Sequence, residues 1–144
     1  MFFSTFTNRI DKKGRVSVPA PFRAVLTKEG AGEVFVNAAL GEACLRCFGP
    51  TYFQKMQKVL DGMDPFSPER DALASVIFGE TTPLTIDGDG RIVLPAALAQ
   101  FAHIGEEAAF VGKGDVFEIW EPGALKASAK KARGAVGKLF GGKA

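Results

Sequence analysis

Short stretches in which apolar and polar side chains alternate recur along the chain, separated by turn-forming residues. Val16-Ser17-Val18 shows the alternation most clearly, and a period of two is typical of a strand with one buried face. Further strands are expected at residues 2–10, 33–36, 44–48, 108–111 and 116–120. Apolar residues at helical spacing predict helices at residues 21–27, 52–60, 68–77 and 95–102. The pattern therefore predicts an α+β fold, mainly β, with short helices.

One ten-residue unit occurs twice, first as Ile10–Pro19 and again as Ile86–Pro95. Both copies read Ile-Asp-x-x-Gly-Arg and then apolar-x-apolar-Pro-Ala, and they lie 76 residues apart. The strands at 33–36 and 44–48 also have counterparts in the second half, at offsets of 75 and 72 residues. The chain therefore repeats one supersecondary unit, and we expect two small halves that share a core.

Each copy of the unit is predicted to form a strand, a tight turn and a second strand. In a three-residue hairpin loop, a type I turn precedes a residue in the left-handed region, a position that glycine favours. An aspartate at the start of a turn can hydrogen-bond the turn backbone, so each Asp should face the Arg four residues later. The arginines are either turn staples or binding groups, and the two roles are compatible. The residues assigned to this structural role are Asp11, Gly14, Asp87, Gly90 and Arg91, with Arg15 facing Asp11.

Residues 51–80, between the repeats, are predicted to form a helical insert. Thr51 is the expected N-cap of its first helix, which should end at Gly62. Ser67 followed by Pro68 and an acid predicts the start of a second helix. This second helix is expected to bury a stripe formed by Ala72, Leu73, Val76 and Ile77.

The C-terminal residues 124–144 carry apolar residues at helical spacing among lysines. Glycines at four positions weaken a helix there, so a solvated, mobile tail is the expected state. The predicted organisation is a first repeat at 1–50, the insert at 51–80, a second repeat at 81–123 and a basic tail at 124–144.

The formal net charge of +2 is unevenly distributed along the chain. The first repeat carries +3, the insert −2, the second repeat −5 and the tail +6. The repeats therefore share a shape and differ in charge, which indicates that they divide their roles. Opposite charges on one rigid chain also favour contact between the basic half of one subunit and the acidic half of the next. We therefore expect a homo-oligomer larger than a dimer, built by head-to-tail contacts.

Five basic residues gather in and around the first unit: Arg9, Lys12, Lys13, Arg15 and Arg23. The fifteen residues that they span contain a single acid, Asp11. The resulting local charge of +4 suits a phosphate backbone. The counterparts of Lys12 and Lys13 are Gly88 and Asp89, so the turn itself does not require lysine. These residues are therefore candidate DNA contacts, and the alternative interpretation is a solvated loop tip.

Cys44-x-x-Cys47 has the spacing of a zinc or redox motif. Structural zinc sites usually draw four ligands from Cys and His, whereas this chain has no second Cys pair and His103 is its only histidine. The repeat aligns the two cysteines with Val116 and Ile119, so we interpret them as core residues. No metal and no other cofactor is expected.

The sequence contains no Ser/His/Asp grouping, phosphate loop or paired-carboxylate motif, so neither an enzyme nor a small-molecule substrate is expected. Thirteen phenylalanines and an apolar fraction of 47% argue against disorder. No apolar run approaches the ~20 residues of a spanning helix and no signal peptide is recognised, so no membrane partner is expected. Two cysteines without such a signal suit a reducing cytoplasm.

The doubled Asp-x-x-x-Arg unit resembles the MraZ family of bacterial transcriptional regulators, and each copy is similar to an AbrB-type swapped-hairpin module. The resemblance extends from Phe2 to Trp120 and rests on the Gly before each Arg and the Pro-Ala after each strand. It departs from the family at Phe2–Phe6, which lacks a Gly usually found there. The resemblance implies two tandem AbrB-like repeats in a double-split β-barrel, with a helical insert between them.

By the same resemblance, the Arg of the motif contacts double-stranded DNA, the protein forms rings, and the regulated genes are those of cell division and cell-wall synthesis. The expected function is a sequence-specific transcriptional regulator that is cytoplasmic and nucleoid-associated. The alternative is an assembly protein whose rings are its function, with the tail as a membrane contact. The sequence leaves open the operator, the sign of regulation, the ring size and the role of the tail. It also leaves open whether the hairpins exchange within one chain or between chains.

Overall fold

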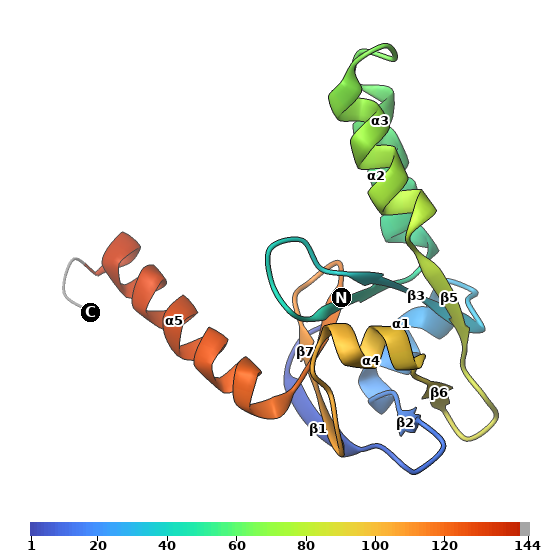
Figure 1. The fold of residues 1–144 in the computed structure, drawn as a ribbon, viewed down its shortest axis with the longest axis vertical. Helices are drawn as coiled ribbons and strands as arrows, with labels where there is room; N and C mark the ends of the chain where they lie inside the picture. The colour runs from blue at the N-terminus through green and yellow to red at the C-terminus, as the bar shows by residue number, and fades with distance from the viewer. Residues whose placement is uncertain (142–144) are drawn as a thin grey trace.

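The computed structural model describes residues 1–141 and shows an α+β protein whose strand pairings are antiparallel (Figure 1). The strands are β1 (Thr5–Arg9), β2 (Arg15–Ser17), β3 (Glu33–Ala38), β4 (Leu45–Phe48), β5 (Thr82–Thr85), β6 (Arg91–Val93), β7 (Glu107–Gly112) and β8 (Phe117–Trp120). Six of them form one open sheet in the spatial order β1-β7-β8-β4-β3-β5, while β2 and β6 form a separate two-stranded ribbon. The α+β class predicted from the alternation pattern is confirmed.

Helices connect or extend these strands. They are α1 (Ala20–Lys28), α2 (Pro50–Asp61), α3 (Pro68–Ala74) with its continuation η1 (Ser75–Gly79), α4 (Ala96–Phe101) and α5 (Pro122–Phe140). The helices predicted at 21–27, 52–60 and 95–102 are therefore present. Helix α1 buries Phe22 and Leu26 against the sheet, and the Phe22 ring lies 5.4 Å from that of Phe2 and 4.8 Å from that of Phe117.

Strands β3 and β4 pair within the first repeat and β7 and β8 within the second, and the remaining pairings join one repeat to the other. Strand β1 of the first repeat pairs with β7 of the second, and β5 of the second pairs with β3 of the first. The ribbon likewise joins one strand from each repeat. The strands on either side of each turn therefore diverge to different partners, where the sequence pattern alone predicted a hairpin.

Equivalent positions of the repeats meet at the centre of the sheet, where β4 pairs with β8. Arg46 lies opposite Glu118, and its Nη2 donates to Glu118 Oε2 at 3.2 Å. The buried carboxylate also accepts from Trp120 Nε1 at 3.0 Å and pairs with Lys113 Nζ at 3.0 Å. Burial raises the pKa of Glu118, but these hydrogen bonds outweigh it and hold the pKa below its ordinary value. Opposite charges thus occupy a position where two like charges would otherwise face each other.

The start of the chain differs from the predicted strand over residues 2–10. Strand β1 begins only at Thr5, because Ser4 has a φ of 75°, in the left-handed region that glycine adopts most easily. Phe2 pairs separately with Gly114, and its side chain is buried in the core. The backbone of Phe2 and Phe3 passes so close to Gly112 that a Cβ there would collide with it.

Residues 50–80, called here the helical arm, project from the sheet as α2 and the α3–η1 helix (Figure 1). The predicted buried stripe is wrong in part: Ala72 is exposed, and Leu73, Val76 and Ile77 are only half-buried, because little of the molecule covers the arm. The predicted N-cap at Thr51 is also wrong. Helix α2 starts after Gly49, and the Thr51 amide donates to the Glu29 carboxylate at 2.8 Å. The predicted cap at Ser67 is confirmed, since its Oγ accepts from the Arg70 amide.

The basic tail is a helix over most of its length, not the loose segment expected from its glycines. The carboxylate of Glu121 accepts from the amides of Gly123 and Ala124, which fixes the start of α5. Ala124 and Leu125 then pack against a cluster that contains Trp120. Beyond that contact α5 extends away from the sheet (Figure 1), and residues 142–144 of the predicted tail lie outside the described part of the chain.

None of the helices within residues 1–141 is both long and apolar enough to cross a membrane.

Candidate nucleic-acid interface

The first turn, Asp11–Arg15, is organised by one carboxylate. Asp11 Oδ1 accepts from the backbone amides of Lys13 and Arg15 at 2.9 and 2.8 Å, and Oδ2 accepts from Arg15 Nε at 2.7 Å. Gly14 has a φ of 79°, the left-handed conformation predicted for it. The predicted pairing of Asp11 with Arg15 is therefore confirmed, while Lys12 and Lys13 are exposed at the tip of the turn.

The second turn, Asp87–Arg91, has the same construction. Asp87 Oδ1 accepts from the amides of Asp89 and Arg91, both at 2.9 Å, and Gly90 has a φ of 78°. Its arginine is held by two carboxylates: Nε lies 3.3 Å from Asp87 Oδ2, and Nη2 lies 3.1 Å from Asp89 Oδ2. The second turn therefore neutralises its arginine more completely than the first.

Both turn aspartates are ionised at neutral pH. The backbone amide of Arg15 is the chief cause that lowers the pKa of Asp11, and the amide of Arg91 does the same for Asp87. Each aspartate therefore orients its arginine through a fixed negative charge, and an arginine side chain so positioned needs little further ordering when it binds a ligand.

The ribbon brings the two arginines onto one face. Val16 pairs with Ile92, and both are buried, so the residues on either side of each point outward. Arg15 lies opposite Val93, and Ser17 lies opposite Arg91. The outward face of the ribbon thus carries an arginine from each repeat. The sequence does not predict this neighbourhood, because the offset of a repeat shows that two segments are alike and not that they pair.

The five basic residues predicted as one cluster are separated by the fold. Lys12, Lys13 and Arg15 stay together in the first turn, and Arg9 ends β1 opposite Glu107. Arg23 lies beside the other turn, where its guanidinium lies against Gly90 so closely that a side chain there would collide with it. The reason is the exchange of strands, which packs each turn against the helix of the other repeat.

Hollows beside the turns reflect this arrangement. One of about 550 Å³ lies between α1 and the second turn, with Arg23 and Thr27 in its wall. Another of about 480 Å³ lies between α4 and the first turn, and Ala99 stands in its wall at the position equivalent to Arg23. The first turn therefore keeps its lysines free of any arginine from the neighbouring helix.

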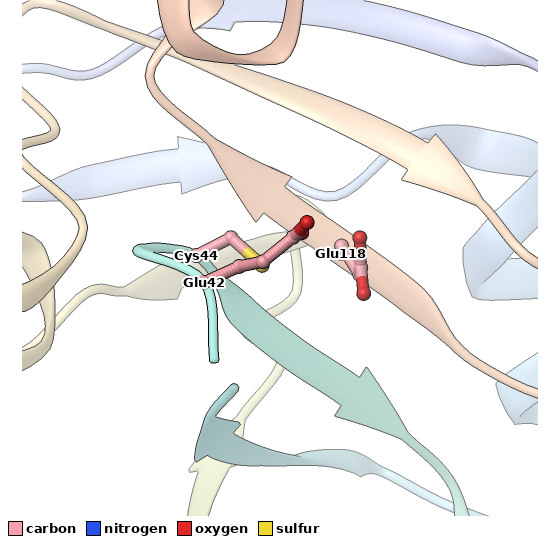
Figure 2. A group of neighbouring side chains, drawn as sticks. All are labelled: Glu42, Cys44 and Glu118. Atoms are coloured by element: carbon pink, nitrogen blue, oxygen red, sulfur yellow. The ribbon is translucent and has the colours of Figure 1, made fainter. Parts of the chain in front are cut away.

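Glu42, Cys44 and Glu118 lie together at the start of β4 and on β8, with their donor atoms within 4.8 Å of one another (Figure 2). Burial, followed by the two carboxylates, raises the pKa of Cys44 to about 12, so its thiol stays protonated at neutral pH. The Glu118 oxygens already accept from Trp120 and two cations. This donor set does not fit a metal ion.

Both cysteines occupy the buried positions predicted from the repeat. Cys44 and Cys47 have no exposed surface, and burial holds the pKa of Cys47 well above its ordinary value. His103 has a φ of 55° directly after α4, a position that ends the helix. These residues therefore serve the fold.

Comparison with known proteins identifies relatives of the whole chain. A family model described as "MraZ protein, putative antitoxin-like" matches residues 77–133. A protein of Rickettsia bellii (strain OSU 85-389) is 46% identical over 135 residues, which is 91% of this chain and 90% of that protein. One from Rickettsia akari (strain Hartford) is 44% identical over 133 residues, covering 92% and 89%. One from Rickettsia rickettsii (strain Sheila Smith) is 46% identical over 122 residues, covering 85% and 82%.

Each of these three relatives is named Transcriptional regulator MraZ. Each similarity covers at least 85% of this chain and therefore reaches both repeats. At this identity and coverage, the chain belongs to the MraZ family.

Proposed function

We propose that this protein is a DNA-binding transcriptional regulator that contacts double-stranded DNA through its first turn and the outward face of the ribbon. The observation that carries the proposal is the exposed Lys12-Lys13 pair beside Arg15, with Asp11 as the only acid of the turn. The names of the relatives support the same function. A two-stranded ribbon also has the width that the DNA major groove admits.

The residues of the first repeat have distinct roles in this proposal. Lys12 and Lys13 bind phosphates, since flexible exposed ammonium groups neutralise backbone charge without reading bases. Arg15 points from a fixed position and reads a base edge or a phosphate. Arg9 and Arg23 lie apart from the turn and add flanking phosphate contacts. Arg91, held between two carboxylates, serves the second turn and the assembly.

The fold that we assign to the repeats is the AbrB-like swapped-hairpin architecture of a double-split β-barrel. Its support is the pairing of β1 with β7, of β5 with β3 and of β2 with β6, which exchanges strands between repeats. In this assignment residues 1–50 are the DNA-binding repeat and 81–123 the repeat for fold and assembly, with 51–80 as the insert and 124–144 as the basic tail.

We further propose a homo-oligomer larger than a dimer. The opposite charges of the repeats support head-to-tail contact, which closes into rings when the rotation allows. By resemblance to the family, the regulated genes are those of cell division and cell-wall synthesis. The site of action is then the nucleoid in the cytoplasm.

A second candidate function is assembly without specific DNA recognition. It is favoured by the exposed apolar side chains on the helical arm and on α5, which lie far from the ribbon (Figure 1). Exposed apolar surfaces mark contacts with proteins or membranes.

Selection from a random pool of DNA duplexes separates the two functions. A regulator enriches one sequence, and that duplex then resists competition by its scrambled version in a mobility-shift assay. Retention of all duplexes alike, at physiological salt, would show a scaffold with unspecific phosphate attraction.

A further inference from the structure

We propose that the outer half of α5, residues 130–140, binds the tip of the helical arm, residues 61–71, of a second copy of this chain. The inference rests on the proposed homo-oligomer and names the two surfaces that form it. Both surfaces come from the same chain and differ from each other, so the contact is head-to-tail.

The outer half of α5 lacks a partner within the described residues. Val136, Leu139 and Phe140 are 53%, 75% and 82% exposed. The helix carries two interior glycines, Gly134 and Gly137, each of which costs about 1 kcal/mol relative to alanine. A helix of this kind is marginal alone in water, because most helical stability comes from packing of an apolar face. The free end of α5 is therefore a surface that requires a contact.

The tip of the helical arm, residues 61–71, is the matching surface. It projects Phe66, which is 92% exposed, and Val59 on the adjoining turn of α2 is 49% exposed. Leu60 is the single fully buried residue of α2, and α3 buries none. The tip therefore leaves Phe66 and part of Val59 uncovered within the described residues.

Charge complementarity selects the arm as the partner of α5. The helix carries five basic residues and no acid: Lys126, Lys130, Lys131, Arg133 and Lys138. The tip carries four acidic residues: Asp61, Asp64, Glu69 and Asp71. Its one basic residue is Arg70, whose Nε donates to the carbonyl of Leu60. The apolar side chains on each surface thus lie among charges opposite to those on the other.

The geometry makes this a contact between copies. Figure 1 shows α5 and the arm projecting from different sides of the sheet, well apart from each other. The base of α5 is fixed, because Leu125 packs in the cluster around Trp120 and Glu121 caps the helix. A fixed base holds α5 away from its own arm and directs it toward the next molecule.

An anionic membrane is the rival partner for a basic amphipathic helix. Membrane-surface helices carry bulky apolar residues along the whole apolar face. Apart from Leu125, which packs against the sheet, the bulky apolar residues of α5 are confined to its end. Its middle is rich in alanine: Ala127, Ala129, Ala132 and Ala135. Small residues allow close approach of another helix, which favours a protein partner.

The test is the molar mass of the full chain by multi-angle light scattering at several concentrations. We expect Lys130→Glu with Lys131→Glu, and separately Asp61→Lys with Asp71→Lys, to raise the concentration needed for assembly at least tenfold. All four residues are exposed, so circular dichroism should be unchanged. The quadruple variant should assemble like the wild type, because the reversed charges again attract.

Apolar variants supply a second readout. Phe66→Ser should weaken assembly, whereas Leu40→Ser should not, because Leu40 is 72% exposed and lies outside both surfaces. If the wild type assembles and every charge and apolar variant has the same molar mass as the wild type, the inference is overturned, although the proposed oligomer stands. A wild type that remains at the 15.3 kDa of one chain would refute the proposed oligomer itself, and the inference with it.

Two further assays distinguish other partners of α5. In the first, the wild type sediments with phosphatidylglycerol vesicles and the Lys130→Glu, Lys131→Glu variant does not, while the molar mass of the assembly is the same for both. That result would assign α5 to a membrane and overturn the inference. Loss of DNA affinity alone in that variant, again at unchanged mass, would assign α5 to phosphate attraction and overturn it as well.

Discussion

The first and second turns share one backbone plan. In each, an aspartate accepts from two backbone amides, a glycine lies near a φ of 80°, and the arginine side chain is about one-third exposed. They differ in the two residues between, which are Lys12 and Lys13 in one and Gly88 and Asp89 in the other. The backbone plan therefore depends on the Asp, Gly and Arg positions, and the charge presented to a partner depends on the residues between them.

The same contrast holds in the centre of the sheet, where the equivalent residues Arg46 and Glu118 pair. A symmetric sequence would place two like charges there. Divergence between the repeats thus stabilises the molecule at its centre and separates the roles of its turns at the surface.

The largest expected effect is at this central pair. Glu118→Ala should destabilise the protein by about 3 kcal/mol, because it leaves Trp120 Nε1 and two cations without their buried partner. Arg46→Ala should cost less, since Glu118 keeps Lys113 and Trp120. Urea denaturation measures both. An equal cost for the two variants would show that the carboxylate does not organise the cluster.

Arg15→Ala comes next. It should lower affinity for the selected DNA and remove about 1–3 kcal/mol of discrimination against the scrambled duplex, if Arg15 reads a base edge. Competition binding measures the ratio. A uniform loss on both duplexes would instead assign Arg15 to a phosphate.

The turn glycines test the shared backbone plan. Gly14→Ala should destabilise the protein by about 1–2 kcal/mol, because the position requires a left-handed residue. Gly90→Ala should cost at least as much, because its Cβ would also displace the Arg23 guanidinium. Gly88→Ala is the matched control, since a Cβ there meets nothing within 4 Å. Thermal unfolding compares the three variants. A harmless change at Gly90 alone would show that the two turns are not equivalent.

The parts of this structure that sequence predicted are local. Asp11 finds Arg15 within one turn, and Gly14 is required by the conformation of that turn, so neighbouring residues suffice to specify both. Cys44 was placed in the core by comparison with Val116 in the other repeat.

The parts that sequence missed depend on distant contacts. The exchange of strands moved Arg23 to the second turn and set Arg91 beside β2, and no local pattern contains that information. The glycines of α5 argued against a helix, yet Glu121 caps it and Leu125 anchors it. The stripe around Val76 is half-exposed because little of the molecule covers the helical arm.

Placing the lysines of the first turn in the second turn has a smaller expected effect on DNA binding, and it tests whether charge alone separates the two turns. Gly88→Lys with Asp89→Lys gives the second turn the charges of the first. If the second turn faces DNA and is excluded only by its charge, the slope of log affinity against log salt should steepen by up to about two units. An unchanged slope would show that geometry, and not charge, keeps the second turn from DNA.

The central claim is that the first repeat binds DNA and the second serves fold and assembly. Salt titration of DNA binding tests it most directly, on Lys12→Ala with Lys13→Ala and on Arg91→Ala, with the molar mass of each variant checked. Replacing both lysines should make the slope of log affinity against log salt shallower by up to about two units for each first turn that contacts DNA, because each neutralised phosphate contributes about 0.9. Arg91→Ala should leave the slope nearly unchanged and lower the thermal stability or the assembled mass. An equal change of slope in both variants, in intact oligomers, would show that both repeats contact DNA and would contradict the division of roles.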